Sequence, residues 1–443
     1  MKKKLIFGLC LCLAAGSLSA CGADASSADG GKSQKAGMKG ELSLLTSGSN
    51  YNDCAAEHGY YYLNEEGDHI MYVDYESRKE LYLCSRPGCK HDTEECPSYI
   101  NETERLTGNS LFYYKDHLYL FSRDFDNDGT TAIDYLADGS EPMGDLSVVS
   151  SPAALYQMNP DGTERKKVCS FDEGAALEDT VLCDDSGLYF IEKRLTSEQV
   201  DDQTTTVSSK DRKLIRVDTS QWKQEEVCDM DEQSGIIGCY GGKLVVCSVQ
   251  YQKELTAEEK LDDDIFTEAL NESKSVYALF DPATEESREI YSVKNDRINN
   301  ALLKGKYLYA AAEGDGDIKK IDVETGDASV FVKTQNNNLN GIYEDVLACS
   351  SWDAADSASY YIHLDDGVIE RSDLKNRYKD YPLEVRAETP DGFLVVCDYD
   401  AHTDPVYPDQ DNIEGIQFAL IDKADLYSGT ENYEKIEMTS KGL

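Results

Sequence analysis

Three cysteines and one histidine lie close together between positions 84 and 96. Cys84, Cys89, His91 and Cys96 form a C-x4-C-x-H-x4-C pattern. Thiolate and imidazole groups are the usual ligands of structural zinc sites, which need four of them. Cysteines at this spacing can also form a disulfide or remain free thiols. Cys54 is a further candidate ligand from another part of the chain. Zinc, one disulfide and unligated thiols therefore all stay open as interpretations.

A second group of candidate ligands is the acidic stretch DFDNDG. Asp124, Asp126 and Asp128 occupy alternate positions before Gly129, which is the oxygen spacing of a calcium-binding loop with its glycine turn. The closing bidentate glutamate is missing, because Tyr135 occupies the twelfth position. The stretch predicts either a calcium site or a solvated acidic turn.

The segment DYDAHTDPVYPDQDN, residues 398–412, gathers aromatic and titratable side chains. Tyr399, His402 and Tyr407 stand among several carboxylates, and such a group could contact a sugar or a cation. An ordinary polar loop is the alternative interpretation.

Catalytic motifs are absent from the sequence. It contains no G-x-S-x-G, H-E-x-x-H, G-x-G-x-x-G or P-loop pattern, so no catalytic residue is nominated and we expect no enzymatic role. With 43 basic and 85 acidic residues, the formal net charge is −42. This charge disfavours nucleic acids and anionic lipid headgroups as partners and leaves cations or neutral ligands.

Repeated pairs of short apolar segments indicate the elements that must position these groups. Hairpins such as LFYYKDHLYLF recur along the chain, and each is followed by a second pair whose first strand ends in Asp or Asn. The first and last of these marker residues lie 348 residues apart, about 58 residues per interval over six intervals; the markers are Asp74, Asn159, Asp218, Asp281, Asp322, Asp365 and Asp422. The pattern predicts an all-β protein, a β-propeller of four-stranded antiparallel blades. Seven blades fit the markers, and six or eight stay open because the first strands are unclear.

Most cysteines occupy repeated apolar positions in this pattern. Cys84, Cys169 and Cys228 each lie ten residues after a marker, where other repeats have Tyr291 and Val332. We therefore expect most cysteines to be unpaired core residues, with Cys84 packing like the others.

The connections between the two hairpins of a repeat are often long, whereas the turns inside hairpins are short. Binding residues usually lie on long loops carried by a rigid scaffold, so we expect one elaborated face, with the Cys/His stretch on it. One long connection contains TAEEKLDDDIFTEAL, where Thr256 and Glu259 form a capping box before a short helix. That helix could lie across the propeller or dock a partner.

The N-terminus has the layout of a secretory signal. Three lysines precede an apolar run that is too short to span a bilayer, and LSAC ends at Cys21. LSAC resembles a bacterial lipobox, and the resemblance implies cleavage before Cys21 and lipid on its sulfur. We expect a signal peptide at 1–20, a flexible lipid-anchored tether at 21–45 and a single propeller domain at 46–443. Residues 41–45 or the segment after Cys54 are expected to complete the first blade, and one of them to close the ring against the last blade.

The chain as a whole resembles the TolB-like β-propellers of envelope lipoproteins. It is also similar to uncharacterised lipoproteins of anaerobic Gram-positive bacteria that carry a Cys/His cluster after their first blade. The resemblance implies a location at the extracytoplasmic face of the cell membrane and no established activity. We expect a propeller that binds a ligand or envelope partner through its long-loop face. A polysaccharide hydrolase or lyase and a structural component of an envelope assembly are the alternatives.

Overall fold

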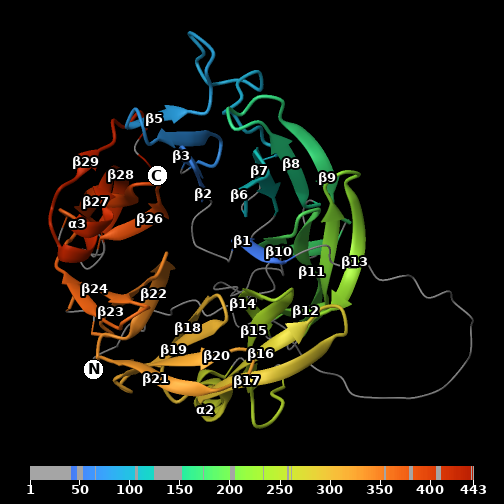
Figure 1. Ribbon diagram of the computed structural model, residues 1–443. Helices are drawn as coiled ribbons and strands as arrows, with labels where there is room; N and C mark the ends of the chain where they lie inside the picture. The colour runs from blue at the N-terminus through green and yellow to red at the C-terminus, as the bar shows by residue number, and fades with distance from the viewer. Residues whose placement is uncertain are drawn as a thin grey trace, which may run out of the picture.

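The protein is a ring of seven antiparallel β-sheets, which follow one another around the ring in chain order (Figure 1). The all-β propeller with seven blades is thus confirmed. The computed structural model describes residues 41–46, 53–64, 66–104, 108–123, 152–172, 174–199, 205–232, 234–256, 259–260, 262–353, 356–378, 383–405, 411–440 and 442. Cys21, Asp124, Asp126, Asp128 and Tyr407 lie outside these residues.

Each blade has four consecutive strands in chain order from the centre of the ring outward, and blade 3 has one additional strand. Blade 1 has β2 (Asp53–Ala56), β3 (Gly59–Leu63), β4 (Ile70–Asp74) and β5 (Lys79–Tyr82). Blade 2 has β6 (Ser110–Tyr114), β7 (His117–Ser122), β8 (Ala154–Met158) and β9 (Lys166–Ser170). Blade 3 has β10 (Ala175–Cys183), β11 (Gly187–Gln199), β12 (Thr205–Asp218) and β13 (Lys223–Asp229). Blade 4 has β14 (Ser234–Tyr240), β15 (Lys243–Gln250), β16 (Lys274–Asp281) and β17 (Glu286–Lys294).

The remaining blades repeat this order. Blade 5 has β18 (Asn299–Lys304), β19 (Tyr307–Ala312), β20 (Asp317–Asp322) and β21 (Ala328–Lys333). Blade 6 has β22 (Asn338–Tyr343), β23 (Val346–Ser350), β24 (Ser359–His363) and β25 (Ile369–Ser372). Blade 7 has β26 (Glu384–Glu388), β27 (Gly392–Thr403), β28 (Asp411–Asp422) and β29 (Glu434–Lys435). Each predicted marker residue stands at the end of a third strand or within two residues of it.

Apolar side chains from neighbouring blades form seven buried clusters, one at each blade interface around the ring. All described cysteines are free thiols. Cys169, Cys228, Cys349 and Cys397 are buried within these clusters, as the repeat positions predicted. Cys54 also packs against the cluster between blades 1 and 2.

Strand direction gives the ring two different faces. The turns from first to second strand and from third to fourth strand open on one face, which we call the turn face. The links from second to third strand and from blade to blade open on the other, the connection face. Strands β11 and β12 continue their pairing as far as Gln199 and Thr205, and β27 and β28 as far as Thr403 and Asp411. These two hairpins are the β11–β12 arm and the β27–β28 arm, and both extend on the connection face.

Strand β1 (Ser43–Thr46) lies inside the ring and pairs with β10, so blade 3 has a fifth, innermost strand (Figure 1). Residues 41–45 therefore do not complete the first blade, whose inner hairpin comes from the segment beginning at Asp53. The strand also begins inside the stretch predicted to be tether.

The ring closes through the C-terminal segment, not through an N-terminal strand, so that expectation was wrong. Lys79 in β5 forms a parallel bridge with Glu437. The amide of Glu80 donates to the carbonyl of Glu437 at 2.9 Å, and the amide of Glu437 donates to the carbonyl of Arg78 at 2.9 Å. A parallel pairing across the seam satisfies backbone groups that an open edge would leave exposed.

The predicted helix is α2 (Asp263–Glu272), in the connection between β15 and β16. The capping box is present one turn earlier: the Thr256 amide donates to Glu259 Oε2 at 3.0 Å, and the Glu259 amide donates to Thr256 Oγ1 at 3.2 Å. None of the residues of helix α2 is buried. A six-residue helix, α3 (Lys423–Ser428), follows β28. Within the described part of the chain, no helix is long and apolar enough to cross a membrane.

Candidate functional site

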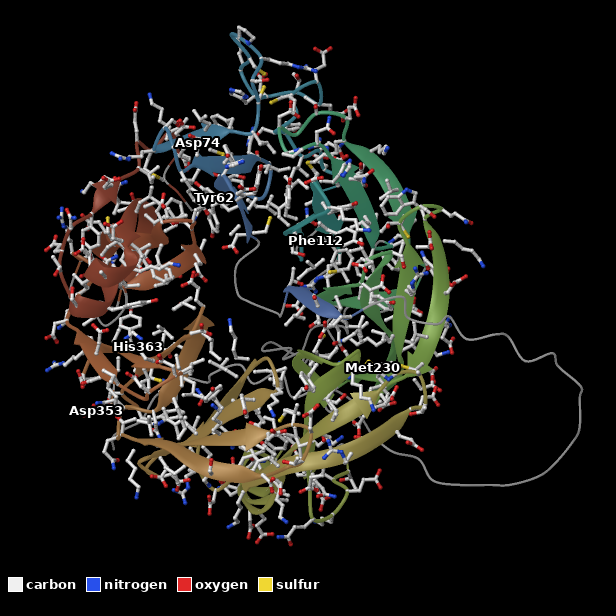
Figure 2. All side chains as sticks on the ribbon, in the orientation of Figure 1. Tyr62, Asp74, Phe112, Met230, Asp353 and His363 are labelled. Carbon is white, nitrogen blue, oxygen red and sulfur yellow. The ribbon has the colours of Figure 1, made fainter. Side chains whose placement is uncertain are left out.

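The Cys/His stretch begins directly after β5 and runs outward from the edge of the ring between blades 1 and 2 (Figures 1 and 2). The stretch starts at the connection face and was expected to lie over that face. It lies instead at the outer rim of the ring. The reason is that β5 is the outermost strand of its blade. The chain therefore leaves the ring at its edge before it returns to the inner strand β6.

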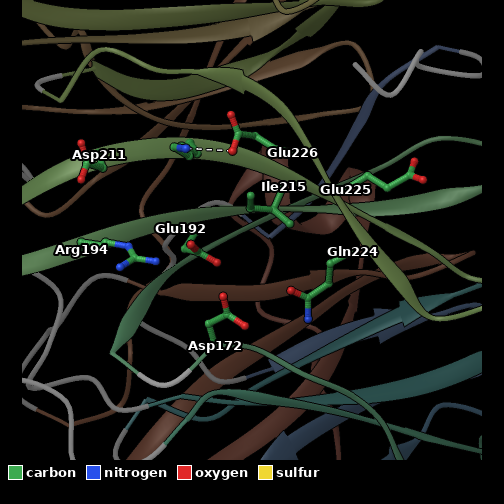
Figure 3. A pocket seen from close by; sticks show the side chains of 9 residues that line it. Asp172, Glu192, Arg194, Asp211, Ile215, Gln224, Glu225 and Glu226 are labelled. Atoms are coloured by element: carbon green, nitrogen blue, oxygen red, sulfur yellow. Dashed lines mark hydrogen bonds and ion pairs between the residues drawn. The ribbon is translucent and has the colours of Figure 1, made fainter. Parts of the chain in front are cut away.

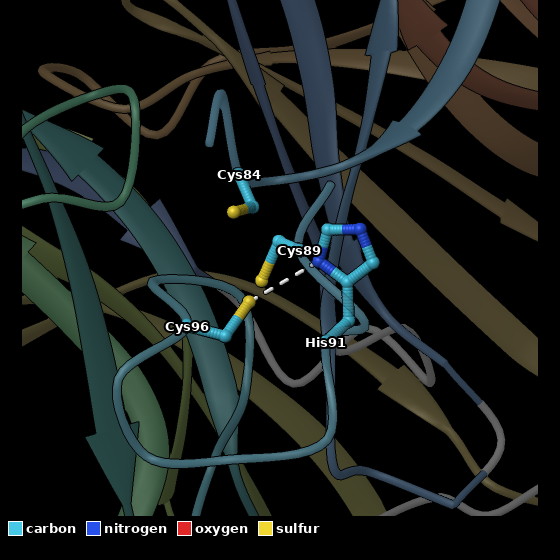
Figure 4. A group of neighbouring side chains, drawn as sticks. All are labelled: Cys84, Cys89, His91 and Cys96. Atoms are coloured by element: carbon cyan, nitrogen blue, oxygen red, sulfur yellow. Dashed lines mark hydrogen bonds between the residues drawn. The ribbon is translucent and has the colours of Figure 1, made fainter. Parts of the chain in front are cut away.

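The four side chains of this stretch converge on one point (Figure 4). One potential ligand atom from each of Cys84, Cys89, His91 and Cys96 lies within 4.8 Å of the other three. Nδ1 of His91 is 3.2 Å from Sγ of Cys96. Zinc bonds to sulfur of about 2.3 Å place tetrahedral ligands about 3.8 Å apart, so shifts of about 1 Å or less in these separations would complete the coordination. The site can hold a metal ion.

Cys84 corrects the prediction made from its repeat position. It was expected to pack like Cys169 and Cys228, but it is only half-buried and belongs to the Cys/His cluster. Cys54, the other candidate for fourth ligand, contributes to a hydrophobic cluster instead. The fourth candidate ligand thus comes from the stretch itself.

The electrostatic environment suits metal binding. A hydrogen bond with the backbone of His91 lowers the pKa of Cys89, and Cys96, Cys84 and Arg86 act in the same direction. Burial lowers the pKa of His91, and the neighbouring His69 lowers it further. Burial raises the pKa of Cys96 to about 11. Neutral imidazole and thiolate are the forms that bind metals, so the shifts of His91 and Cys89 both favour the metal-binding form. A bound cation would favour the thiolate of Cys96.

His91 is held in a defined position by its neighbours. Its ring stacks on Tyr82 with the ring centroids 4.3 Å apart. Its carbonyl oxygen lies 2.6 Å from Nε2 of His69, whose Nδ1 lies 2.6 Å from a carboxylate oxygen of Asp68. The backbone of His91 has a φ of 59°, in the left-handed region. These contacts offset the cost of that conformation and fix the ring orientation.

The stretch is also fastened to both blades. The amide of Ile70 donates to the carbonyl of Ser98 at 2.9 Å, which joins the stretch to β4. From the β8–β9 turn, Arg165 Nη1 donates to the carbonyl of Pro97 at 3.0 Å. In the same turn, Gly162 has a φ of 78° and lies so close that an added Cβ would be 3.0 Å from the carbonyl oxygen of Leu83. The Cys/His stretch therefore bridges blades 1 and 2.

The structure separates the other predicted binding residues. The Tyr399 hydroxyl donates to Glu384 Oε2 at 3.2 Å, and its ring packs against the cluster between blades 7 and 1. His402 lies farther along the β27–β28 arm, with Nδ1 3.3 Å from Glu414 Oε1 and its side chain 53% exposed. Tyr399 and His402 thus belong to different surroundings.

A polar cavity of about 500 Å³ lies at the base of the β11–β12 arm (Figure 3). Its walls come from β11, β12, β13 and the link that follows β9: Asp172, Glu192, Arg194, Asp211, Lys213, Ile215, Gln224, Glu225 and Glu226. Five of these side chains are carboxylates and two are cations. Lys213 lies 2.8 Å from Glu226, so one cation is already paired.

Two features describe the chemistry of this cavity. Burial raises the pKa of Glu192, and nearby Asp172 raises it further, while Arg194 and Lys213 oppose the rise. Gln224 reaches across to blade 2 and donates to the carbonyl of Ser170 at 2.7 Å. The lining holds more acidic than basic groups, five against two, so a positively charged group would be favourable there.

Sequence reasoning missed this cavity because its residues come from four separate segments. One signal was present: residues 192–194 in β11 and 211–213 in β12 are all charged, and these segments lie on paired strands. Glu192 stands directly opposite Lys213. Such a concentration of charged residues in a long connection indicates a polar site there.

Comparisons with known proteins add little. No family profile and no curated protein matches the chain. Among solved structures, a puromycin-hydrolysing peptidase from Mycobacterium tuberculosis aligns with 91% of this chain and 54% of its own, at 9% identity and a TM-score of 0.46. An oligogalacturonate lyase from Vibrio parahaemolyticus aligns with 80% of this chain and 87% of its own, at 12% identity and a TM-score of 0.44. An oligogalacturonate lyase in complex with manganese covers 76% of this chain and 80% of its own, at 12% identity and a TM-score of 0.43. Similarity at this level carries no inference about activity.

Proposed function

We propose that this chain is a lipid-anchored, extracytoplasmic β-propeller that binds an envelope ligand or partner through its connection face. The LSAC sequence ending at Cys21 supports the anchor. The two arms extend on the connection face, and the cavity of about 500 Å³ at the base of the β11–β12 arm is the observation that carries the binding role. Concave polar sites beside elaborated loops are common ligand sites.

The chemistry of the cavity favours a ligand that carries a positive charge. Outside the Lys213–Glu226 pair, Asp172, Glu192 and Asp211 outnumber the one lining cation Arg194. Glu225 is paired with Lys223 at 3.1 Å. An amine or guanidinium would form charge-assisted hydrogen bonds with these carboxylates. Gln224 adds an amide that can bond neutral polar groups.

Calorimetric titration of the mature domain with spermidine and with a lysine-rich peptide tests this function. Replacing two cavity carboxylates, Asp172→Asn with Glu192→Gln, is expected to weaken binding about tenfold or more, because two charge-assisted bonds are lost. The matched control is Asp365→Asn with Asp391→Asn, which removes the same charge from two turns on the turn face. The control should bind like the natural protein. Equal weakening in both variants, or no binding of either probe, would contradict the proposal.

We also propose zinc as the ion held by Cys84, Cys89, His91 and Cys96. Three sulfurs and one nitrogen form a typical structural zinc set, and four protein ligands leave no position for water or substrate. The ion would hold the Cys/His stretch between blades 1 and 2 and would not act in catalysis. The calcium site predicted at Asp124, Asp126 and Asp128 stays a prediction, as do the polysaccharide-cleaving and assembly alternatives.

Metal analysis of the purified mature domain tests the zinc centre. The natural protein is expected to contain one zinc per chain, and the variant with Cys89→Ser and Cys96→Ser is expected to contain none. Cys247→Ser is the control, because Cys247 is a half-buried thiol within the blade 4 and 5 cluster. Absence of stoichiometric metal in the natural protein would refute the centre, and so would retention of zinc by the double variant.

A further inference from the structure

We infer that the propeller stands with its turn face toward the membrane and presents its connection face to partners that approach from outside. This inference rests on the lipid anchor proposed above. The feature that carries it is β1, the strand that joins the N-terminal part of the chain to the ring (Figure 1).

The register of β1 shows where the chain enters the ring. Ser43 stands opposite Cys183, at the end of β10 that leads into the β10–β11 turn on the turn face. Thr46 stands opposite Val181, nearer the connection face, and the amide of Val181 donates to Thr46 Oγ1 at 3.1 Å. The strand therefore runs from the turn face toward the connection face. Strand β2 then begins on the connection face at Asp53, which agrees with this direction.

The entry point is fixed by packing. Leu42, just before β1, is 3% exposed and belongs to the buried cluster between blades 3 and 4. Leu44 packs against the same cluster, and Leu45 packs against the cluster between blades 2 and 3. Contacts on both sides hold β1 inside the ring, so the anchor is joined near the centre of the turn face.

In this orientation, the segment between Cys21 and Leu42 takes the shorter path from the membrane to the ring. The roughly 20 residues between Cys21 and Leu42 are predicted from their composition to be a tether, and a coil of that length has an end-to-end distance of about 25 Å. Blade strands of about six residues make the ring about 20 Å thick before the arms are counted. To bring the connection face to the membrane, the segment would have to pass around the outside of the ring. That path would require most of this segment to be extended, which would cost conformational entropy.

The charge of the turn face argues against a close contact with lipid. Asp116, Asp185, Asp365, Asp366 and Asp391 lie in turns on this face. Repulsion between such carboxylates and anionic headgroups acts over a screening length of about 8 Å, which is shorter than the segment. The ring can therefore remain clear of the headgroups. Its partner at the connection face is then a soluble or wall-bound molecule, not a lipid headgroup.

Energy transfer on vesicles tests the orientation. The lipidated full chain would be placed in phosphatidylcholine vesicles that contain an acceptor-labelled lipid, with a donor dye on a single non-natural residue. Val368, 51% exposed in the β24–β25 turn, reports on the turn face, and Ile413, 40% exposed in the β27–β28 arm, reports on the connection face. Transfer is expected to be about twofold or more stronger from position 368, because the faces differ in height by about 20 Å. Equal transfer, or stronger transfer from position 413, would overturn the inference.

Flotation of the same samples separates this inference from the proposed anchor. Protein that floats with the vesicles but shows the reversed transfer would leave the anchor intact and refute the orientation alone. Protein that does not float, like the Cys21→Ser control, would refute both. Measuring transfer only in the floated fraction keeps the two outcomes distinct.

Discussion

Asp53, at the start of β2, belongs to a polar group where blade 1 meets blade 7. It accepts a hydrogen bond from the Tyr60 hydroxyl, and Arg386 Nη1 lies 3.9 Å from its carboxylate. Arg386 Nε also lies 3.1 Å from Glu384. The side chains of Asp53 and Arg386 are each only 13% exposed, so this group serves the blade interface more than contact with a substrate. Burial raises the pKa of Asp53 to about 6, against the lowering effects of Tyr60 and Arg386.

This shift predicts a pH dependence of stability. The folded pKa of about 6 lies above the ordinary value of 3.8, so the folded state holds the proton more tightly. The stability contributed by protonated Asp53 is fully present at pH values below the ordinary pKa and is lost as the pH rises through 6. Between pH 5 and pH 8 this group should cost the natural protein about 1.4 kcal/mol of unfolding free energy. Urea unfolding of Asp53→Asn should lack this decline, since the amide does not ionise and can still accept from Tyr60. Parallel pH profiles for the two proteins would contradict the assignment.

The Cys/His centre shows how far residue types alone can lead. The four candidate ligands were identifiable because thiol and imidazole groups at short spacing are restricted by the chain to one neighbourhood. The choice between Cys84 and Cys54 could not be predicted from the sequence. The repeat position of Cys84 indicates packing, whereas its actual surroundings depend on how the stretch folds back. The cavity at Glu192 was harder still, because its walls meet only after three strands pair.

At the level of elements, the closure of the ring depends on one buried carboxylate. Glu80 in β5 is 0% exposed. Its Oε2 accepts from the amides of Thr439 at 2.6 Å and Ser440 at 2.5 Å, and its Oε1 accepts from Ser440 Oγ at 2.6 Å. The Tyr62 hydroxyl also donates to it. Glu80 therefore ties the C-terminal segment to blade 1.

Removing this carboxylate should loosen the seam. Glu80→Ala leaves several buried donors without their acceptor and is expected to lower the unfolding free energy by about 3 kcal/mol. Glu437→Ala is the control from the same seam, because its ion pair with Lys79 joins side chains that are 73% and 49% exposed. That control should cost about 0.5 kcal/mol or less. Chemical denaturation of both variants provides the comparison, and similar losses would show that Glu80 is not the closing group.

Element positions were predictable where local sequence determines them. Strand pairs joined by tight turns were found because short turns fix the pairing partner, and the capping box at Thr256 marked the helical segment for the same local reason. Strand β1 was misplaced because no turn links it to its partner. Its pairing with β10 depends on the shape of the finished ring, as does the closure by the C-terminal segment.

For the whole molecule, the decisive property is the difference between the two faces. Seven blades could be counted from the sequence, since each marker residue stands at the end of a third strand or within two residues of it. The faces could be distinguished by the lengths of their connections. The entry of the chain through the turn face could not be predicted from the sequence, because it depends on the direction in which β1 pairs. With the proposed anchor at Cys21 and the proposed binding through the connection face, the anchor and the binding surface would lie on opposite sides of the ring.

Photo-cross-linking in cells tests this division most directly. His402 on the β27–β28 arm and His58 in the β2–β3 turn are both exposed histidines, and they lie on opposite faces. Each would be replaced, in turn, by a photo-reactive phenylalanine analogue in the full chain. We expect cross-linked products from position 402 and few or none from position 58. Products that arise equally from both positions, or mainly from position 58, would contradict a binding role for the connection face.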